Sequence, residues 1–401
     1  MKKVINFIII FFIIFFSYQF GFSLGKGKEK DMYKELDIFA EALSIVNEKY
    51  IEEKPAKELI YGAISGLVSA LDPYSEFLDP QAYQDLLIDT EGEFGGIGIE
   101  ITIKDGLLTV ISPIEDTPAW RANIEPNDVI VKIDGELTKG ISLNEAIKKI
   151  RGTPKTKVSI TILKHSNRNI EDITLERDII KIKSIKRSLI LEDRIGYIRI
   201  VEFREKTVDD LIEALEKLKK DNLKALIIDV RNNPGGLLDS AINTSSIFLE
   251  EGKPIVSIKS KDKKEFLYKS LNTKEKYLDI PIVILINKGS ASASEIFASA
   301  LRDNNRAILL GENTFGKASV QTVIPLLDNS AIRLTTAKYY TPKGLIIQDK
   351  GITPDILVLE EEVNKKENIF EKLENKEDFD YKKDIFILRA LDLLKGLLIL
   401  K

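Results

Sequence analysis

The sequence predicts a multidomain α/β protein, and three observations lead to this prediction. At 401 residues the chain is long enough for two or three domains. Apolar residues make up 44% of it and charged residues 30%, which fits a folded body. Between residues 181 and 359, strand-like apolar runs alternate repeatedly with helical patterns, as is typical of an α/β core.

The composition narrows the possible functions. The net charge is −4 and no dense basic stripe occurs, so nothing indicates nucleic-acid binding. The chain has no cysteine, which excludes disulfides, a thiolate nucleophile and cysteine metal sites. Its single histidine, His165, and the lack of a clustered carboxylate motif argue against a dedicated catalytic metal site. No motif implies a cofactor.

Residues 1–24 predict export. Lys2 and Lys3 precede an apolar run over 4–16 that continues more weakly to Leu24. About 20 apolar residues suffice to cross a bilayer, and the lysines favour a cytoplasmic N-terminus. The segment is therefore either an uncleaved membrane anchor or a cleaved signal peptide, and the lack of an A-x-A site favours the anchor. In both cases we expect the body outside the cytoplasm, in the periplasm or at the cell surface.

Residues 25–90 are predicted to be helical. Apolar residues recur at helical spacing over Asp37–Val46 and again over Leu59–Leu71, where Asp72-Pro73 ends the second helix. These helices cannot bury much core alone. We therefore expect them to pack on a partner chain, as in a homodimer, or on the amphipathic helix predicted within the C-terminal region, residues 360–401. The charged stretch 360–376 is predicted to be a solvated linker or helix.

Residues 91–180 predict a small β-rich module. It opens with the glycine-rich turn Gly96-Ile97-Gly98-Ile99, which feeds an alternating strand. Phosphate binding is the usual rival interpretation of such a turn. Further strands are expected at Leu107–Ile111, within Ile124–Thr138 and at Lys157–Leu163, and helices at Pro118–Ala122 and Leu143–Ile150.

The body, residues 181–359, contains a turn that presents bare amides. Pro234-Gly235-Gly236 follows a buried strand and precedes a helix start, so its backbone N–H groups are expected to be free. A glycine-rich helix entry is the plain alternative. The polar stretch 267–278 is expected to be a loop or lid. Strands are predicted at Arg194–Ile200, Ala225–Val230, Ile282–Ile286, Arg306–Leu310 and Ala331–Tyr340, and helices at Val208–Lys219 and Glu295–Leu301.

Three serines follow the apolar strand Ile282–Ile286. The chain turns through Asn287-Lys288-Gly289 and reaches Ser290, Ser292 and Ser294 at the start of a helix. A serine on a tight strand-to-helix turn is how α/β hydrolases expose a nucleophile. The free N–H groups of the helix start can stabilise an oxyanion. The residues alone do not choose among the three serines.

A serine nucleophile needs a base, and Lys317 is the best candidate. His165 lies in the polar cluster KHSNRN, which predicts a hairpin tip. A serine–lysine dyad needs no histidine, but its lysine must be neutral through burial or a nearby positive charge. Lys317 sits among small and apolar residues, and Gln321, four positions on, falls on the same side in helix or strand. A surface lysine beside a polar helix cap is the plain alternative.

Several motifs together resemble the carboxyl-terminal processing proteases. They are GSASASEI at Gly289–Ile296, FGK at Phe315–Lys317, Gln321, and IQDKGITPDI at Ile347–Ile356. The resemblance covers roughly residues 35–400. It implies a core of the ββα-spiral type found in the crotonase and Clp-protease superfamily.

The same resemblance implies roles for single residues. Ser292 would be the nucleophile, Lys317 the general base and Gln321 the residue that orients the lysine. The backbone N–H groups of Gly235, Gly236 and Ala293 would form the oxyanion hole.

The β-rich module resembles a PDZ domain. Gly96, Ile97, Gly98 and Ile99 match the loop whose N–H groups capture a peptide C-terminal carboxylate, after which the peptide adds as a strand. Residues 153–156 depart from the family pattern, which often carries a glycine there. Arg151 either couples peptide binding to the body or is an exposed arginine at a helix end.

These expectations combine into an extracytoplasmic serine endopeptidase that cleaves proteins at or near apolar C-termini. One rival is a membrane-tethered PDZ peptide-binding protein with an inactive body, but the complete Ser292, Lys317 and Gln321 set argues against it. A crotonase-like acyl-CoA enzyme would share the body fold. The export signal and the PDZ-like module argue against that rival.

Overall fold

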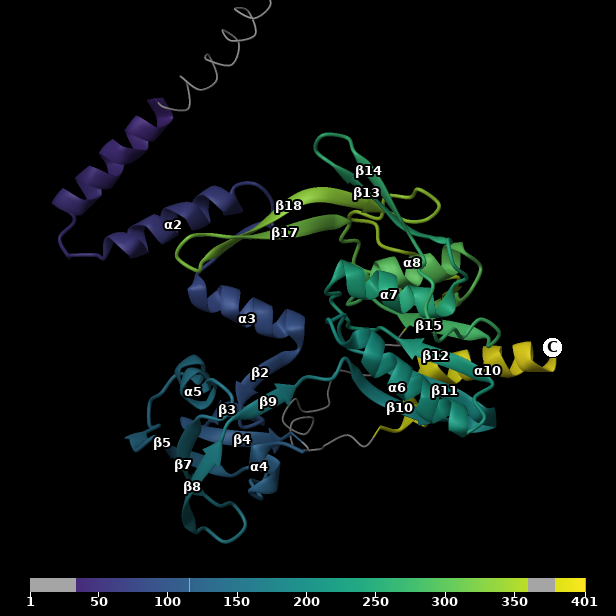
Figure 1. Ribbon diagram of the computed structural model, residues 1–401, viewed down its shortest axis with the longest axis horizontal. Helices are drawn as coiled ribbons and strands as arrows, with labels where there is room; N and C mark the ends of the chain where they lie inside the picture. The colour runs from purple at the N-terminus through teal and green to yellow at the C-terminus, as the bar shows by residue number, and fades with distance from the viewer. Residues whose placement is uncertain (1–33, 115, 360–378, 401) are drawn as a thin grey trace, which may run out of the picture.

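The computed structural model describes residues 34–114, 116–359 and 379–400 (Figure 1). The predicted anchor or signal peptide, residues 1–24, and the predicted linker, 360–376, lie outside these residues. Within the described ranges, no helix combines the length and the apolar character needed to cross a membrane.

The body is built on a six-stranded sheet in the order β10-β11-β12-β15-β16-β19. β10 pairs antiparallel with β11, and the other neighbours are parallel. All five residues of β12 and of β15 are buried, because parallel strands covered on both faces read as continuous apolar runs. The strands are β10 (Ile185–Ile190), β11 (Ile195–Ile200), β12 (Ala225–Asp229), β15 (Ile282–Ile286), β16 (Ile308–Gly311) and β19 (Ile356–Leu357).

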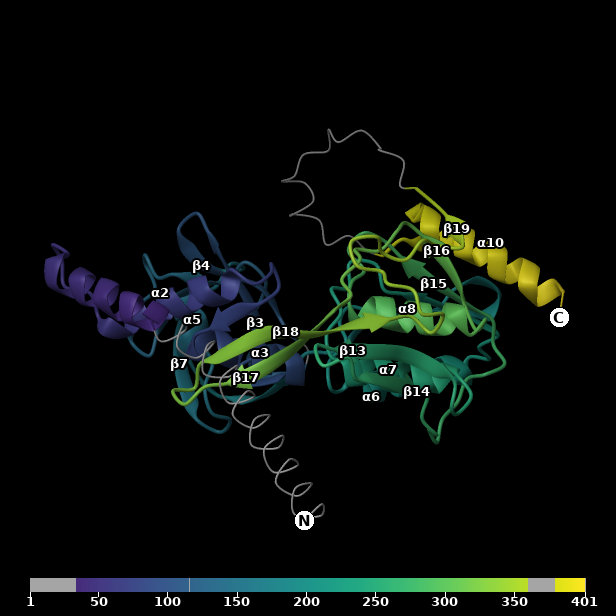
Figure 2. The ribbon, with the colours of Figure 1, turned by 90° about the horizontal axis from the view of Figure 1, so that it is seen from above.

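Helices cover both faces of this sheet. On one face α6 (Thr207–Lys220), α7 (Leu238–Phe248) and α8 (Ala293–Asp303) share a core with alternate strand residues. On the other face α10 (Ile385–Ile399) packs through buried residues that include Ile387 and Leu391. The prediction that the C-terminal helix packs within one chain on the N-terminal helices is therefore wrong. The apolar face of α10 packs against the six-stranded sheet. α10 lies at the end of the molecule opposite to the N-terminal helices (Figures 1 and 2).

A second, antiparallel sheet forms an arm that reaches from the body to the N-terminal region (Figure 2). Strands β17 and β18 form a long hairpin in this sheet, with a β-bulge between Val320 and Gln321 of β17. Residues 267–269, predicted as loop, belong to an exposed edge strand of this sheet, so that prediction is wrong for them. The strands are β1 (Glu76–Leu78), β13 (Pro254–Ser260), β14 (Glu265–Lys269), β17 (Ser319–Pro325) and β18 (Ala331–Tyr340).

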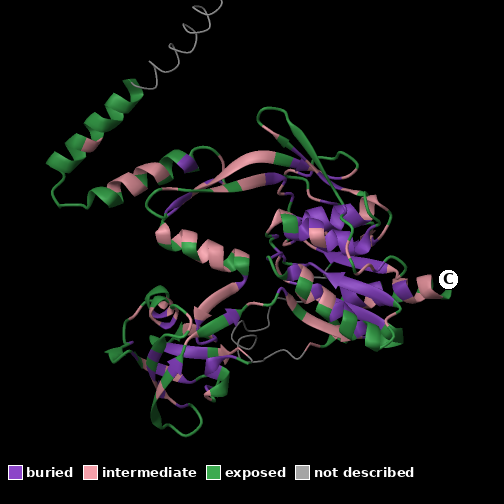
Figure 3. Ribbon diagram, in the orientation of Figure 1, coloured by how far each residue is buried: buried purple, intermediate pink, exposed green. Residues whose placement is uncertain are grey.

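The N-terminal helices carry little core of their own. Residues 34–49 are helical and almost wholly exposed (Figure 3). Val68 is the buried residue of α2 (Ala56–Ser69). α2 contacts β1 through an edge-to-face pair of Tyr61 and Phe77, whose ring centroids lie 4.8 Å apart. The helix α3 (Pro80–Glu91) lies almost wholly within the region predicted to be helical, although no separate helix was delimited there. Exposed apolar side chains of the first helix include Leu36, Ile38, Phe39, Ile45 and Val46.

The β-rich module forms a separate five-strand path, β3-β4-β5-β7-β8, with β6 on β5. The chain enters and leaves it through a two-stranded ribbon of β2 (Glu93–Gly96) and β9 (Asp178–Lys181), which forms a neck (Figure 1). Its elements are β3 (Ile99–Lys104), β4 (Leu107–Pro113), α4 (Pro118–Arg121), β5 (Val129–Ile133), β6 (Glu136–Leu137), α5 (Leu143–Ile150), β7 (Lys157–Leu163) and β8 (Ile170–Glu176).

Candidate active site

The turn between β15 and α8 holds Ser292 in a strained conformation. Ser292 has φ 53° and ψ −114°, a region that residues with a side chain rarely adopt. The surrounding structure maintains this strain. The Asn287 side-chain oxygen accepts the N–H of Asn232 at 2.8 Å and that of Gly289 at 3.0 Å, which fixes the turn against its neighbour. The result is a serine presented at the mouth of α8.

The structure distinguishes the three serines that the sequence could not. Ser290 donates its hydroxyl to the Val230 carbonyl at 2.7 Å, and Ser294 donates to the Asn233 carbonyl at 3.0 Å. Both of these side chains are fully buried. Ser292 is partly exposed, and its hydroxyl donates to no carbonyl of the described residues. Of the three, Ser292 is therefore the one whose oxygen a substrate can reach.

The turn Pro234-Gly235-Gly236 lies against this serine. Gly235 and Gly236 have φ +110° and +129°, and a Cβ on Gly235 would lie 2.8 Å from Ser292 Cβ. Gly235 itself donates its N–H to Asn233 Oδ1 at 2.9 Å, so this amide is not available to an oxyanion. The N–H groups of Gly236 and Ala293 have no acceptor among the described residues. The predicted set of three amides thus reduces to two.

Lys317 and Gln321 come together, as the spacing suggested. Lys317 Nζ donates to Gln321 Oε1 at 3.0 Å and lies 5.0 Å from the centroid of the Tyr74 ring. Gln321 Nε2 in turn donates to the Tyr74 carbonyl. Within the described residues no hydrogen bond joins Lys317 Nζ to Ser292 Oγ. The Lys317 amine therefore contacts the Gln321 amide and the Tyr74 ring rather than the Ser292 hydroxyl.

The surroundings lower the pKa of Lys317. The largest cause is burial, which disfavours the ammonium form, and the second is the nearby positive charge of Arg333. Glu76 and Asp72 raise the pKa in opposition, but Glu76 is itself paired with Arg333 at 2.7 Å. A lowered pKa is the direction that a lysine general base requires.

Glu295 joins the segments that carry Ser292 and Lys317, and the prediction had given it no role. Its carboxylate is fully buried, and burial raises its pKa. Oε2 accepts the backbone N–H of Ser292 at 2.9 Å and that of Lys317 at 3.0 Å. Oε1 accepts from Gly316 N at 2.8 Å and Thr314 Oγ1 at 2.5 Å. The sequence did carry a signal, because Ser-x-x-Glu at a helix start is a capping box.

Tyr339 of β18 connects the arm to the same centre. Its side chain is buried, and its hydroxyl donates to the Ser292 carbonyl at 3.2 Å and to Glu295 Oε2 at 3.4 Å. Burial, followed by the Glu295 charge, raises the pKa of Tyr339, so the hydroxyl stays protonated and able to donate.

A buried arginine fixes the end of β12 before the glycine turn. Arg231 binds Asp229 through two hydrogen bonds of 3.0 and 2.7 Å. It also binds Asp384, the N-cap of α10, at 3.1 and 2.7 Å. Such paired, planar contacts are the strongest hydrogen bonds that an arginine makes. The C-terminal helix is therefore attached to the strand that leads into the turn at Gly235.

In the predicted peptide-binding loop, residues 96–99, some backbone groups are paired within the module and others are free. Gly96 pairs with Asp178 in the neck, and Ile97 is buried in the module core. The carbonyls of Ile97 and Gly98 accept from Ala119 and Ile114 at 2.8 and 2.9 Å, while their N–H groups have no acceptor in the described structure. β3, which begins at Ile99, pairs with β4 on one edge and with no described strand on the other.

Arg151 is not simply an exposed arginine at a helix end. Its guanidinium stacks over the Phe94 ring at 4.5 Å and pairs with Asp85 of α3 at 3.3 Å. It thus joins the end of α5 to the neck and to α3. In the turn that departs from the family pattern, Lys155 takes φ +69° in place of a glycine. His165 lies in the β7–β8 turn of the module, apart from the Ser292 turn.

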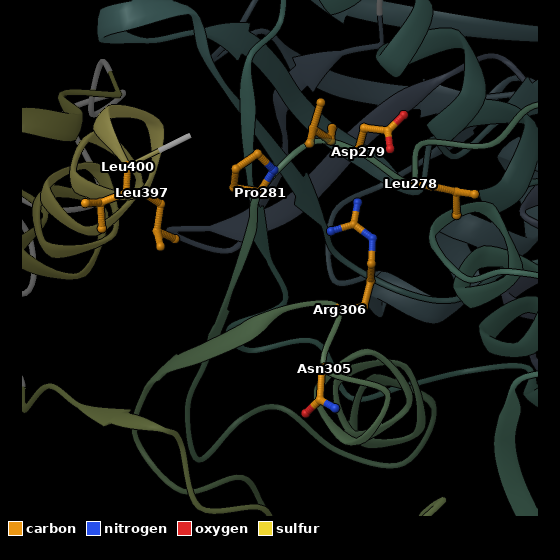
Figure 4. Close-up of a pocket in the computed structure, with 8 residues that line it drawn as sticks. Leu278, Asp279, Pro281, Asn305, Arg306, Leu397 and Leu400 are labelled. Carbon is orange, nitrogen blue, oxygen red and sulfur yellow. The ribbon is translucent and has the colours of Figure 1, made fainter.

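A pocket of about 390 Å³ lies elsewhere, between the end of α10 and the loop before β15 (Figure 4). Arg306 lines it but donates to the carbonyls of Phe248 and Tyr277 at 3.0 and 2.6 Å, which is a structural use. None of the predicted site residues lines this pocket. In the described ranges no group of acidic or histidine side chains is arranged to hold a metal ion.

Comparisons with known families match three segments of the chain. Residues 194–358 match peptidase family S41, and residues 109–164 match the PDZ domain. Residues 22–82 match the N-terminal domain of the activating protease CtpB.

Individual relatives extend these matches over most of the chain. A carboxy-terminal-processing protease of Bartonella bacilliformis is 42% identical over 89% of this chain and 83% of its own length. A protein named "Probable CtpA-like serine protease" of Staphylococcus aureus is 37% identical over 83% of this chain and 66% of its own. A crystal structure from Bacteroides fragilis, of a protein assigned to the S41 proteases, is similar in fold, with 14% identity, a TM-score of 0.51, and coverage of 88% and 97%.

Proposed function

Because the chain belongs to peptidase family S41, the carboxy-terminal-processing serine proteases, we propose that Ser292 is its nucleophile and Lys317 its general base. One observation supports this pairing above the others. The backbone N–H groups of Ser292 and Lys317 meet on a single buried oxygen, Glu295 Oε2, at 2.9 and 3.0 Å. Two segments 25 positions apart in sequence number thus converge beside a glycine turn with a free amide.

In the proposed reaction, neutral Lys317 takes the proton of the Ser292 hydroxyl as Oγ attacks the scissile carbonyl carbon. The N–H groups of Gly236 and Ala293 stabilise the oxyanion that develops on the carbonyl oxygen. The ammonium of Lys317 then gives its proton to the leaving amine, and the C–N bond breaks. Water, activated by Lys317, hydrolyses the acyl-enzyme and restores Ser292.

For this reaction Lys317 Nζ has to turn from Gln321 toward Ser292. The lysine stem has four rotatable methylenes, and its backbone is already tied to that of Ser292 through Glu295. Gln321 lies at the β17 bulge, where the ladder is interrupted and the strand can bend. The ββα-spiral topology of the core is part of the same proposal.

The module is proposed to recognise the C-terminal tail of the protein substrate. The free amides of Ile97 and Gly98 suit a terminal carboxylate, and the open edge of β3 suits an added strand. α5 contacts β3 and so lies next to this strand, and a preference for apolar tails is part of the same proposal. The contacts of Arg151 with Asp85 and Phe94 connect the end of α5 to α3 and to the neck, and they would couple binding of the tail to the position of the neck.

Features of the N-terminal region support a proposal for the cellular location of the protein and for its assembly into a homodimer. The lysine-flanked apolar run of residues 4–16 supports export and attachment to the membrane, with the body outside the cytoplasm. The exposed apolar side chains of residues 34–49 and of α2, such as Phe39 and Leu67, support a homodimer through these helices. α10 has no part in it, because the sheet already covers its apolar face.

A serine-reactive probe tests the assignment. We expect labelling of the wild type, and none of Ser292→Ala, while both proteins unfold at the same temperature. Ser294→Ala and Ser290→Ala are the controls, because both keep Ser292: Ser294→Ala loses one buried hydrogen bond, and Ser290→Ala loses two, to the Val230 carbonyl and from the Asn287 N–H. Ser294→Ala should lose roughly 1 kcal/mol of stability and Ser290→Ala roughly 2 kcal/mol, and both should still label. An unlabelled wild type would favour the rival, a peptide-binding protein with an inactive body.

Tail recognition has its own test. A protein substrate ending in an apolar tail is compared with the same substrate whose terminal carboxylate is amidated. We expect amidation to slow cleavage about tenfold or more, because the loop amides lose a charged acceptor. Equal rates for the two substrates would contradict carboxylate capture by residues 96–99.

A further inference from the structure

The segment between α2 and β1 is a rigid turn built on Asp72. The Asp72 carboxylate accepts the backbone N–H of Tyr74 at 2.8 Å and that of Ser75 at 2.9 Å. It also accepts the Ser75 hydroxyl at 2.8 Å. Three bonds to one short side chain fix the backbone here, as in other aspartate turns. The turn therefore fixes the backbone of Tyr74, from which its ring and its carbonyl project.

This turn holds the arm at the level of the predicted active site. Thr335 of β18 donates its N–H to Ser75 Oγ at 3.1 Å and its hydroxyl to Asp72 at 3.2 Å. In the hairpin register Thr335 lies directly opposite Gln321, next to the bulge. The turn therefore binds the strand across from the residue that accepts the Lys317 amine.

Tyr74 completes a closed set of contacts around that amine. Its carbonyl accepts Gln321 Nε2, which turns the other end of the amide, Oε1, toward Lys317 Nζ at 3.0 Å. Its ring faces the same Nζ at 5.0 Å. The tyrosine thus orients Gln321 through its backbone and contacts Lys317 through its side chain.

The groups around Nζ act in opposite directions on its charge. An aromatic ring at this distance favours the ammonium form. Asp72 and Glu76 also favour it, while burial and Arg333 favour the neutral amine. The ammonium is therefore best accommodated against Tyr74, and a neutral amine loses the attraction of the ring.

We propose that Tyr74 is a positioning residue that docks the ammonium form of Lys317 away from Ser292. When the ammonium gives its proton to solvent, the neutral amine leaves the ring and reaches the Ser292 hydroxyl. This inference rests on the proposed Ser292–Lys317 dyad. It adds a control of the base by the segment that precedes the arm.

The test is the pH dependence of kcat/KM for the full chain with Tyr74→Leu and Tyr74→Phe. Loss of the ring removes a stabilisation of the ammonium, so the acid limb of Tyr74→Leu should move to lower pH by about 0.5–1.5 units. Below the limb this corresponds to a rise in kcat/KM of about 3- to 30-fold. Tyr74→Phe keeps the ring, and its limb should stay at the wild-type position.

Phe77→Leu is the matched control. It removes a ring from the same stretch of chain, but that ring contacts Tyr61 rather than Lys317. Its acid limb should coincide with the wild type. A Tyr74→Leu limb that also coincides would overturn the docking role, and so would a Tyr74→Phe limb that moves as far as that of Tyr74→Leu.

Two further variants keep the outcome decisive. If Tyr74→Leu does not fold, Tyr74→Trp supplies a stronger ring and should move the limb to higher pH, and an unmoved limb would overturn the inference. Lys317→Ala separates this inference from the function beneath it. Full activity of Lys317→Ala would remove the dyad and the docking together. An inactive Lys317→Ala combined with an unmoved Tyr74→Leu limb would remove the docking alone.

Discussion

Glu295→Gln should damage both stability and catalysis, although it removes only a charge. The carboxylate accepts hydrogen bonds at both oxygens, from Ser292, Lys317, Gly316 and Thr314. An amide offers one oxygen and one NH2 group, so one side of the new residue must face donors with a donor. The change keeps the volume and the shape of the side chain, and no cavity is created.

The loss of stability in Glu295→Gln depends on whether the amide nitrogen of the glutamine replaces Oε1 or Oε2. On the Oε2 side it would face the N–H groups of Ser292 and Lys317, and on the Oε1 side that of Gly316, because the Thr314 hydroxyl can rotate to accept. One unsatisfied buried N–H costs about 1–3 kcal/mol. The remaining hydrogen bonds become weaker because their acceptor is no longer charged. Part of this loss is offset because burial disfavours the charged form of Glu295 and raises its pKa, and the substitution removes that charge. We expect a net loss of about 2 kcal/mol.

The assay is thermal unfolding combined with kcat on a protein substrate. The loss should lower the Tm of the body by about 4–8 °C. A shift of the Ser292 or Lys317 backbone should lower kcat about 100-fold at temperatures where the variant is folded. Glu216→Gln, on the exposed face of α6, is the control and should stay within about 0.5 kcal/mol of the wild type. A Glu295→Gln protein with wild-type Tm and kcat would refute a joint role for this carboxylate.

Three other predictions follow from the same geometry. Gly235→Ala should lose at least 100-fold in kcat, because its Cβ would lie 2.8 Å from Ser292 Cβ, whereas Gly252→Ala, with φ +81° and open space, should cost only about 1 kcal/mol of stability. Asp384→Asn should lower the free energy of unfolding by about 1–3 kcal/mol by weakening its bonds to Arg231, and a midpoint in urea equal to the wild type would contradict this. The acid limb of kcat/KM should lie below 10.5, the ordinary lysine pKa, because burial lowers the pKa of Lys317. Between its lowered and ordinary values the unfolded chain binds more protons, so this group's contribution to stability rises with pH, and a limb above 10.5 would contradict the assignment.

Elements with a strong local signal could be predicted from the sequence. The strands Ile282–Ile286 and Ala331–Tyr340 and the helix Leu143–Ile150 have the predicted bounds. The first is a continuous apolar run, and the helix starts at a capping box on Ser142. The bounds of α3 were not predicted within the helical region because its apolar periodicity is weak, although Asp79 and Pro80 mark its start.

Features set by tertiary contacts could not be predicted in the same way. The C-terminal helix has an apolar face, but periodicity does not say whether a sheet or another helix covers it. β14 is exposed along its length and is a strand because it pairs with β13. The proposal of Ser292 as the nucleophile depends on the carbonyl groups to which Ser290 and Ser294 donate hydrogen bonds. The contact of Tyr74 with Lys317 depends on how the chain folds around both residues. That information lies in residues far away in the sequence.

The dyad is tested most directly by cleavage of a tailed protein substrate with Lys317→Ala and Lys288→Ala. Both changes remove a lysine from the catalytic end of the body, but Lys288 is exposed on the turn before Ser292. We predict that Lys317→Ala loses cleavage by at least 1,000-fold, on the order expected for a general base, and folds as the wild type does, while Lys288→Ala stays near wild-type activity. A folded Lys317→Ala protein that cleaves at the wild-type rate would contradict the mechanism.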